Sequence, residues 1–212
     1  MIIYGFTLSP FVRKTVVFAA EKGLAVEVKP KRPLKDDAEL TACSPFGLIP
    51  GFRDGDFTIS DSSAIVAYMD AKKPDPVLIP AEAQARARTV WYEEFADTML
   101  SVIMAKIFIN RIGSQKFRGQ PGDLGVADAA ERDELPPLLA YLEGVIPASG
   151  FLAGGKFTLA DISVASQFVN FAHAGVTIDA ARYPKVKRYT QAIHERPSFA
   201  SLITQERAFL AG

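Results

Sequence analysis

The sequence predicts two domains of different class: a mixed α/β domain in residues 1–74 and an all-helical domain in residues 82–212. Within the first 72 residues, short strand-like and helix-like segments alternate. Residues 72–80 (KKPDPVLIP) hold three prolines and few periodic positions, which is typical of a linker. Beyond this linker every periodic segment has helical spacing. A chain of 212 residues is long enough for two small domains.

The elements of the first domain follow the order β-α-β-α-β-β-α. A polar cap followed by proline, Ser9-Pro10, starts the first helix, and Gly23 closes it. Asp54-Gly55 lies between two strand-like runs, which is a strong hairpin signal. A β-α-β unit followed by a hairpin predicts a small mixed sheet with helices packed on it. The expected strands are 2–5, 26–28, 51–53 and 57–60, and the expected helices are 10–22, 34–41 and the segment from Asp61 to Met69.

The second domain is expected to contain five helices, at 81–111, within 123–146, and at 158–173, 184–195 and 198–210. In the first of them an apolar stripe is predicted from Trp91, Phe95, Met99, Val102 and Ile103. Pro136-Pro137 marks a kink or break in the second. Thr158 and Asp161 have the spacing of a capping box, so they are assigned a structural role. The helix after them has no charged residue from Ile162 to His173, which predicts burial on most sides.

Composition disfavours several functional classes. The 24 basic and 24 acidic residues balance overall and within residues 1–80 and 81–212 taken separately, which disfavours a nucleic-acid partner. The lone Cys43 cannot form an internal disulfide, so a reducing, cytoplasmic location is expected. No secretion signal or membrane span is visible. His173, His194 and Cys43 form no metal-ligand pattern, so we expect no bound metal.

Five segments in order carry a family resemblance. They are TLSPFVRK (7–14), SPFGLIPGF (44–52), DGDFTISDSSAIVAYM (54–69), FLAGGKFTLADIS (151–163) and YPKVKRYTQAIHERPSF (183–199). In this order the chain resembles a cytosolic glutathione transferase, with serine at the thiol-activating position. The resemblance spans nearly the whole length and implies a thioredoxin-like N-terminal domain and a helical C-terminal domain.

Ser9 is the candidate catalytic residue. From spacing alone, a serine before proline is more often only a helix cap. The resemblance reverses this preference, because the same position holds the activating serine or cysteine in many members. A hydroxyl at a helix N-terminus favours a thiolate through its hydrogen bond and through the helix dipole. Tyr4 is the rival activator, although its ring is expected to fill the core, and Thr7 and Arg13 are weaker candidates.

The resemblance also assigns glutathione-binding residues. Ile49-Pro50 matches the family's cis-proline position, where the backbone of Ile49 would pair with the peptide as in strand addition. The usual lysine two positions earlier is replaced by Leu48, so Lys35, Lys31 or Arg32 would have to supply that positive charge. Asp61 and Ser62 match the pair that holds the γ-glutamyl end, a role compatible with helix capping.

The reaction implied is attack of the glutathione thiolate on a small hydrophobic electrophile. Phe11, Met104 and Phe108 are the candidates for that second pocket. The resemblance implies a homodimer and glutathione as co-substrate, with no further cofactor. Two alternatives stay open. One is a glutathione-dependent isomerase or ether-cleaving lyase on the same fold. The other is a non-catalytic binding protein, to which Leu48 gives some weight and against which Ser9, Ile49-Pro50 and Asp61-Ser62 count.

Overall fold

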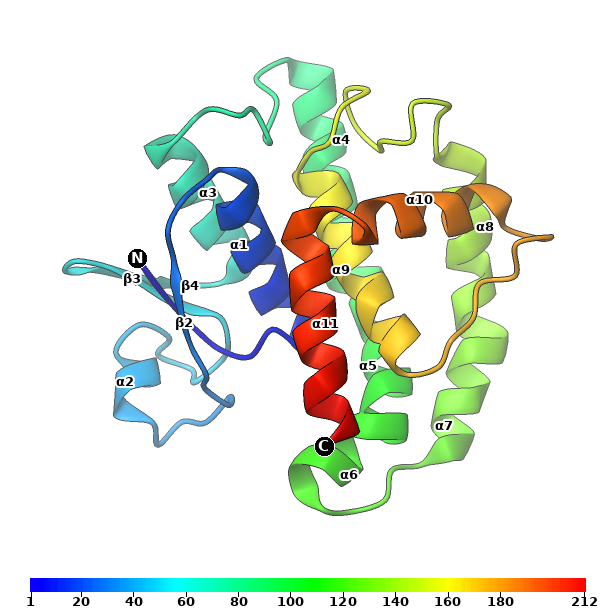
Figure 1. The fold of residues 1–212 in the computed structure, drawn as a ribbon, viewed down its shortest axis with the longest axis horizontal. Helices are drawn as coiled ribbons and strands as arrows, with labels where there is room; N and C mark the ends of the chain where they lie inside the picture. Colours follow the sequence, from blue (N-terminus) through cyan, green and yellow to red (C-terminus); the bar gives the residue numbers. More distant parts are fainter. The chain divides into compact units, whose positions relative to one another are not determined.

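The computed structural model describes residues 1–212 and divides into two compact units, Met1–Ile79 and Pro80–Gly212 (Figure 1). The first unit holds one four-stranded sheet with the order β2-β1-β3-β4. Its strands are β1 (Ile2–Tyr4), β2 (Glu27–Lys29), β3 (Gly51–Asp54) and β4 (Phe57–Ser60). The β1–β2 pair is parallel and the other two pairs are antiparallel, as a β-α-β unit followed by a hairpin requires.

The helices of the first unit are α1 (Pro10–Glu21), α2 (Ala38–Thr41) and α3 (Ser62–Lys72). The order β-α-β-α-β-β-α is therefore confirmed. The helix predicted at 34–41 is shorter than expected, because the side chain of Asp37 caps it by accepting a hydrogen bond from the Leu40 N–H at 3.0 Å. Figure 1 shows α1 and α3 on one side of the strands and α2 on the other.

The second unit is entirely helical apart from its turns and loops and one isolated β-bridge. Its α-helices are α4 (Ala83–Glu94), α5 (Ser101–Phe108), α6 (Ser114–Arg118), α7 (Leu124–Ala129), α8 (Leu135–Val145), α9 (Leu159–His173), α10 (Pro184–His194) and α11 (Pro197–Ala211). Three π-helical segments join neighbours without a break: η1 (Phe95–Leu100), η2 (Ile109–Gly113) and η3 (Ala130–Glu134). None of these helices is both long and apolar enough to span a bilayer.

The predicted apolar stripe of the first long helix is partly wrong. Phe95 and Ile103 are buried, but Trp91, Met99 and Val102 are each about half exposed, at 51%, 44% and 52%. The wide turns of η1 change the residue spacing, so an extrapolated α-helical stripe loses its phase across residues 95–100. The residues that are in fact buried on this run include Tyr92, Ala96, Leu100, Met104, Ile107 and Phe108.

The kink or break predicted at Pro136-Pro137 is present as the π-helical segment η3, which joins α7 to α8 without interrupting the helix. Both prolines lie in the first turn of α8, where a missing N–H is tolerated best. Neither proline nitrogen carries a hydrogen, so two regular backbone hydrogen bonds have no donor. The π segment directly before the prolines widens the helix at this point.

Helix α9 is the buried centre of the second unit. Every residue from Leu159 to Phe171 is buried, which confirms the prediction from its uncharged sequence. Asp161 reaches back as predicted, and its carboxylate accepts a hydrogen bond from the Thr158 N–H at 2.9 Å. The same carboxylate accepts from the Leu152 N–H at 2.9 Å and from the Tyr189 hydroxyl at 3.2 Å, so it ties a loop and α10 to the start of α9.

Candidate functional site

The sheet register brings the candidate glutathione-binding segments of the first unit to one edge. Tyr4 pairs with Gly51, and Gly51 pairs with Ser60, so β1 ends where β3 begins and where β4 ends. Lys29 ends β2 in the same row, opposite Tyr4. The loop that leads to Ser9, the Ile49-Pro50 bond, the Asp61-Ser62 pair and the segment with Lys35 therefore all leave the sheet at this edge.

Ser9 is the residue before the first turn of α1, with Pro10 at the first helical position. Its side chain makes no capping hydrogen bond, and its C=O accepts the Arg13 N–H at 2.9 Å. The simple explanation of Ser9 as a side-chain cap is therefore wrong. A half-buried hydroxyl without an internal partner is left at the N-terminus of a 12-residue helix, where an anion is favoured.

Tyr4 lies in the core, as its sequence context predicts. The residue is fully buried and packs with Leu40 and Cys43, and alternation along β1 places Ile2 on the same face. Burial raises the pKa of its phenol, and the buried phenolic oxygen has no hydrogen-bond partner. Cys43 is structural in the same cluster: its thiol donates to the Leu40 C=O at 3.2 Å, and burial raises its pKa.

The Ile49-Pro50 bond is cis, as the resemblance implies. Gly5 holds this segment close to α1, because a Cβ at Gly5 would lie 2.5 Å from Val12 and 3.2 Å from the Cβ of Ile49. The backbone of Ile49 takes part in no internal backbone hydrogen bond. Its N–H and C=O therefore remain available to a peptide laid along this edge.

The backbone of Lys35 packs against Gly47, the residue before Leu48. Gly47, at φ 68°, packs so closely that a Cβ there would lie 2.9 Å from the backbone nitrogen of Lys35. Lys35 is exposed and has no ion-pair partner, whereas Lys31 pairs with Asp37 and Glu39, both at 2.9 Å. Leu48 is 63% exposed and supplies no charge.

Asp61 has a backbone conformation that L-residues rarely adopt, with φ 77°. Its Oδ1 caps α3 by accepting from the N–H groups of Ser63 at 2.8 Å and Ala64 at 3.2 Å. Its Oδ2 accepts no hydrogen bond within the unit, and the residue is exposed to solvent. Ser62 is buried at the first helical position, and its hydroxyl also has no internal partner. A free carboxylate oxygen and an open helix N-terminus are thus adjacent, as an amino-acid ligand requires.

One contact was not predicted from the sequence. The amino group of Lys14 is buried and donates to the Ser63 hydroxyl at 3.2 Å, which links the first turns of α1 and α3. The signal was a basic pair, Arg13-Lys14, inside an otherwise apolar helix.

The candidates for the second pocket are divided between the units. Phe11 lies half-buried in the first turn of α1, and Met104 and Phe108 lie buried one turn apart on α5. The structure holds no group of three or more His, Cys, Asp or Glu side chains that could hold a metal ion.

Comparison with known proteins agrees with this arrangement. Residues 3–77 match the family model "Glutathione S-transferase, N-terminal domain", and residues 90–192 match "Glutathione S-transferase, C-terminal domain". Glutathione S-transferase 3 of Zea mays is 30% identical, over 95% of this chain and 92% of that protein. The chain belongs to the glutathione S-transferase family.

The similar proteins do not all carry the same name. A crystal structure of a glutathione S-transferase from Rhodospirillum rubrum F11 superposes with a TM-score of 0.86 at 26% identity, covering 95% of this chain and 90% of that one. A stringent starvation protein A homolog of Coxiella burnetii is 24% identical over 99% of this chain and 94% of that protein. Family membership therefore fixes the fold, and the activity has to be argued from the site.

Proposed function

We propose that this protein is a glutathione S-transferase that activates the glutathione thiol with the Ser9 hydroxyl. The observation that carries the proposal is the state of Ser9, whose hydroxyl is unused by the fold although it stands at a helix N-terminus. A thiol has an ordinary pKa near 8.5, so at neutral pH it needs stabilisation to react as a thiolate. A hydroxyl hydrogen bond together with the dipole of α1 supplies that stabilisation.

The other residues at the sheet edge would hold the tripeptide. The Ile49 N–H and C=O would pair with the cysteinyl backbone, which sets the sulfur beside Ser9. Asp61 Oδ2 would accept from the γ-glutamyl ammonium group, and Ser62 with the first N–H groups of α3 would bind its carboxylate. Lys35 would meet the glycyl carboxylate in place of the missing lysine. Catalysis would then come from the thiolate and from the positioning of both substrates.

A small hydrophobic electrophile would complete the reaction, with Phe11 as the candidate contact from the first unit and Met104 and Phe108 as the candidates from the second. No cofactor beyond glutathione is needed for this chemistry. A homodimer is supported by the large apolar side chains that α4, η1 and α5 expose, including Val90, Trp91, Met99 and Val102.

The test is a pH titration of glutathione thiolate absorbance on the wild type, Ser9→Ala and Tyr4→Phe. We expect wild type and Tyr4→Phe to lower the pKa of the bound thiol. Ser9→Ala should raise it by about 1–2 pH units, since a hydrogen bond to a charged group contributes about 1.5–3 kcal/mol. Because the Ser9 hydroxyl does not cap α1, Ser9→Ala should have the same melting temperature as the wild type.

Each other outcome has a distinct meaning. A thiol pKa that rises in Tyr4→Phe and not in Ser9→Ala would assign activation to the tyrosine. Absence of glutathione binding would leave the non-catalytic alternative. Product analysis with an activated aryl halide would then test conjugation, because conjugation leaves the glutathionyl group on the ring and releases halide, whereas an isomerase returns glutathione unchanged and an ether-cleaving enzyme releases an alcohol or phenol from an ether substrate.

A further inference from the structure

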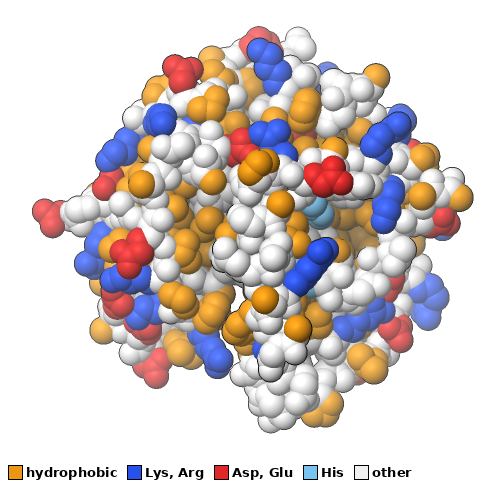
Figure 2. Space-filling view, viewed as in Figure 1, with side chains coloured by type: hydrophobic (Ala, Val, Ile, Leu, Met, Phe, Trp, Pro, Cys, Tyr) orange, Lys and Arg blue, Asp and Glu red, His pale blue; other side chains and the backbone are white.

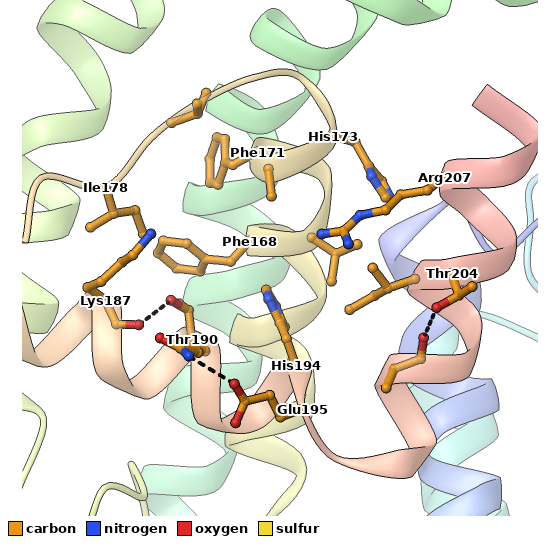
Figure 3. Close-up of a pocket in the computed structure, with 16 residues that line it drawn as sticks. Phe168, Phe171, His173, Ile178, Lys187, Thr190, His194, Glu195, Thr204 and Arg207 are labelled. Atoms are coloured by element: carbon orange, nitrogen blue, oxygen red, sulfur yellow. Dashed lines mark hydrogen bonds between the residues drawn. The ribbon is translucent and has the colours of Figure 1, made fainter. Parts of the chain in front are cut away.

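The second unit contains a cavity of about 390 Å³ between α9, α10 and α11 (Figure 3). None of the residues assigned to glutathione or to the electrophile lines it. Its volume lies within the usual range for small-molecule sites. On the face drawn in Figure 2, a histidine is visible in a hollow with acidic and basic side chains near it.

One part of the cavity wall is apolar. The rings of Phe168 and Phe171 extend from α9, and Ile178 closes this side from the loop that follows the helix (Figure 3). The two rings pack edge to face with their centroids 5.6 Å apart, so they form a fixed surface. The rings are 3% and 1% exposed, so they present only their edges to the cavity, and the half-buried Ile178 offers the more accessible apolar contact. This wall favours an aromatic or aliphatic body over a polar one.

Two cationic side chains extend into the cavity from different helices. Lys187 of α10 ends beside Ile178, and the guanidinium of Arg207 of α11 points inward toward the histidines (Figure 3). Both side chains are without an ion pair, whereas Lys106, Arg111 and Arg132 in the same unit all pair with carboxylates. The one acidic residue of the lining, Glu195, already accepts from the Gln191 amide at 2.9 Å. The cavity therefore has an excess of positive charge.

The histidines give the cavity a preorganised wall. His173 donates from Nε2 to the carboxylate of Glu206 at 2.8 Å, and both side chains are at least 97% buried. His194 donates from Nε2 to the Ala165 C=O at 3.0 Å, which sets the orientation of its ring. Burying a His–Glu pair carries a desolvation penalty that only a well-formed hydrogen bond offsets. The proposed glutathione chemistry makes no use of this pair.

We propose that this cavity is a binding site for a small carboxylate with an aromatic or aliphatic body. The carboxylate would pair with the Arg207 guanidinium near the histidines, and the body would extend past Phe168 and Phe171 toward Ile178, where Lys187 adds positive charge at the other end of the cavity (Figure 3). Charge complementarity selects the anion, and the aromatic wall selects its apolar part. Binding here needs neither glutathione nor the Ser9 hydroxyl, so the site is independent of the proposed transferase activity.

The probe is 4-phenylbutyrate, with 4-phenylbutanol as its uncharged counterpart. Calorimetry on the full-length protein in the presence of saturating S-hexylglutathione measures affinity while the glutathione and electrophile sites are occupied. Chemical shifts of backbone amides in a ¹⁵N-labelled sample locate the probe. The variants are Arg207→Gln and Lys187→Gln, and Lys185→Gln is the matched control because it removes an exposed charge from α10 outside the cavity.

We expect the acid to bind about tenfold or more tightly than the alcohol, with shifts confined to α9, α10 and α11. Arg207→Gln should weaken binding of the acid about tenfold, Lys187→Gln should weaken it by a smaller factor, and the control should match the wild type. All of these side chains are exposed, so the variants should fold. Equal binding of acid and alcohol, loss of binding in the presence of S-hexylglutathione, or equal effects of Lys185→Gln and Arg207→Gln would overturn the proposal.

Discussion

Replacement of Asp161 by asparagine tests how one buried carboxylate holds the second unit together. Oδ1 accepts from the Leu152 N–H and the Tyr189 hydroxyl, and Oδ2 accepts from the N–H and, at 3.3 Å, the hydroxyl of Thr158. An asparagine keeps one acceptor oxygen and turns an NH₂ group toward the other pair of donors. Two buried donors then lose their acceptor, at about 1–3 kcal/mol each.

Each oxygen of Asp161 has one N–H donor and one hydroxyl donor, and the hydroxyl can rotate to another acceptor. The expected loss of unfolding free energy is therefore about 2–4 kcal/mol rather than the full sum. For a chain of this size that corresponds to a melting temperature lower by about 5–15 °C. Asp36→Asn is the control, since it removes an exposed carboxylate that has no ion pair. The transferase rate per folded molecule should be nearly unchanged, because Asp161 belongs to the fold.

The pH dependence of this difference is a sharper test. Burial raises the pKa of Asp161 to about 6 from an ordinary 3.8, although the Leu152 and Thr158 N–H groups oppose the rise. Between these two values the folded chain keeps a proton that the unfolded chain has released. This contribution to stability is therefore complete below the unfolded pKa and is lost as the pH rises through about 6.

Urea unfolding of wild type and Asp161→Asn at pH 4.5 and pH 7 measures that contribution directly, since all other groups titrate in both proteins. The gap in unfolding free energy should be larger at pH 4.5 than at pH 7, by about 2 kcal/mol. A gap that is constant with pH would refute the raised pKa. A gap that narrows at pH 4.5 would show that the backbone N–H groups outweigh burial.

Three further variants follow from other contacts. Lys22→Met should destabilise the protein by about 2–4 kcal/mol in urea unfolding, because the buried amino group donates to two proline carbonyls of the linker and pairs with Asp70 at 2.6 Å. Asp61→Asn should melt with the wild type, since asparagine caps equally well, yet weaken glutathione binding about tenfold in calorimetry; an unchanged affinity would remove Asp61 from the site. Val102→Glu should convert a dimer to a monomer in light scattering after size-exclusion chromatography, and a monomeric wild type would contradict the proposed dimer.

The first unit was predicted well because its signals are local. Asp54-Gly55 between two strand-like runs specifies the hairpin by itself, and Ser9-Pro10 marks a helix start. In the second unit the apolar stripe failed at Trp91, which α4 exposes before η1 begins, and at Met99 and Val102, because the π turns of η1 depend on packing rather than on residue type. No local pattern in residues 95–100 distinguishes a π segment from a regular helix.

The glutathione site and the cavity of the second unit also differ in how far the sequence predicts them. The glutathione edge joins segments whose strands are neighbours in the sheet, so topology alone brings Ser9, Ile49 and Asp61 to one end. What the sequence could not show is the atomic state of these groups: that the Ser9 hydroxyl is left unused, and that Asp61 caps with one oxygen only.

The cavity of the second unit had no comparable signal. From the sequence, His173 and His194 formed no pattern with Cys43 or with each other, yet they lie on consecutive helices that fold back and meet at one cavity. Helix crossing sets which faces meet, and the faces of α9, α10 and α11 are chosen by packing of the whole bundle. A strand order read from sequence therefore locates a site at a sheet edge, whereas a site between helices becomes visible only when the three helices are packed together.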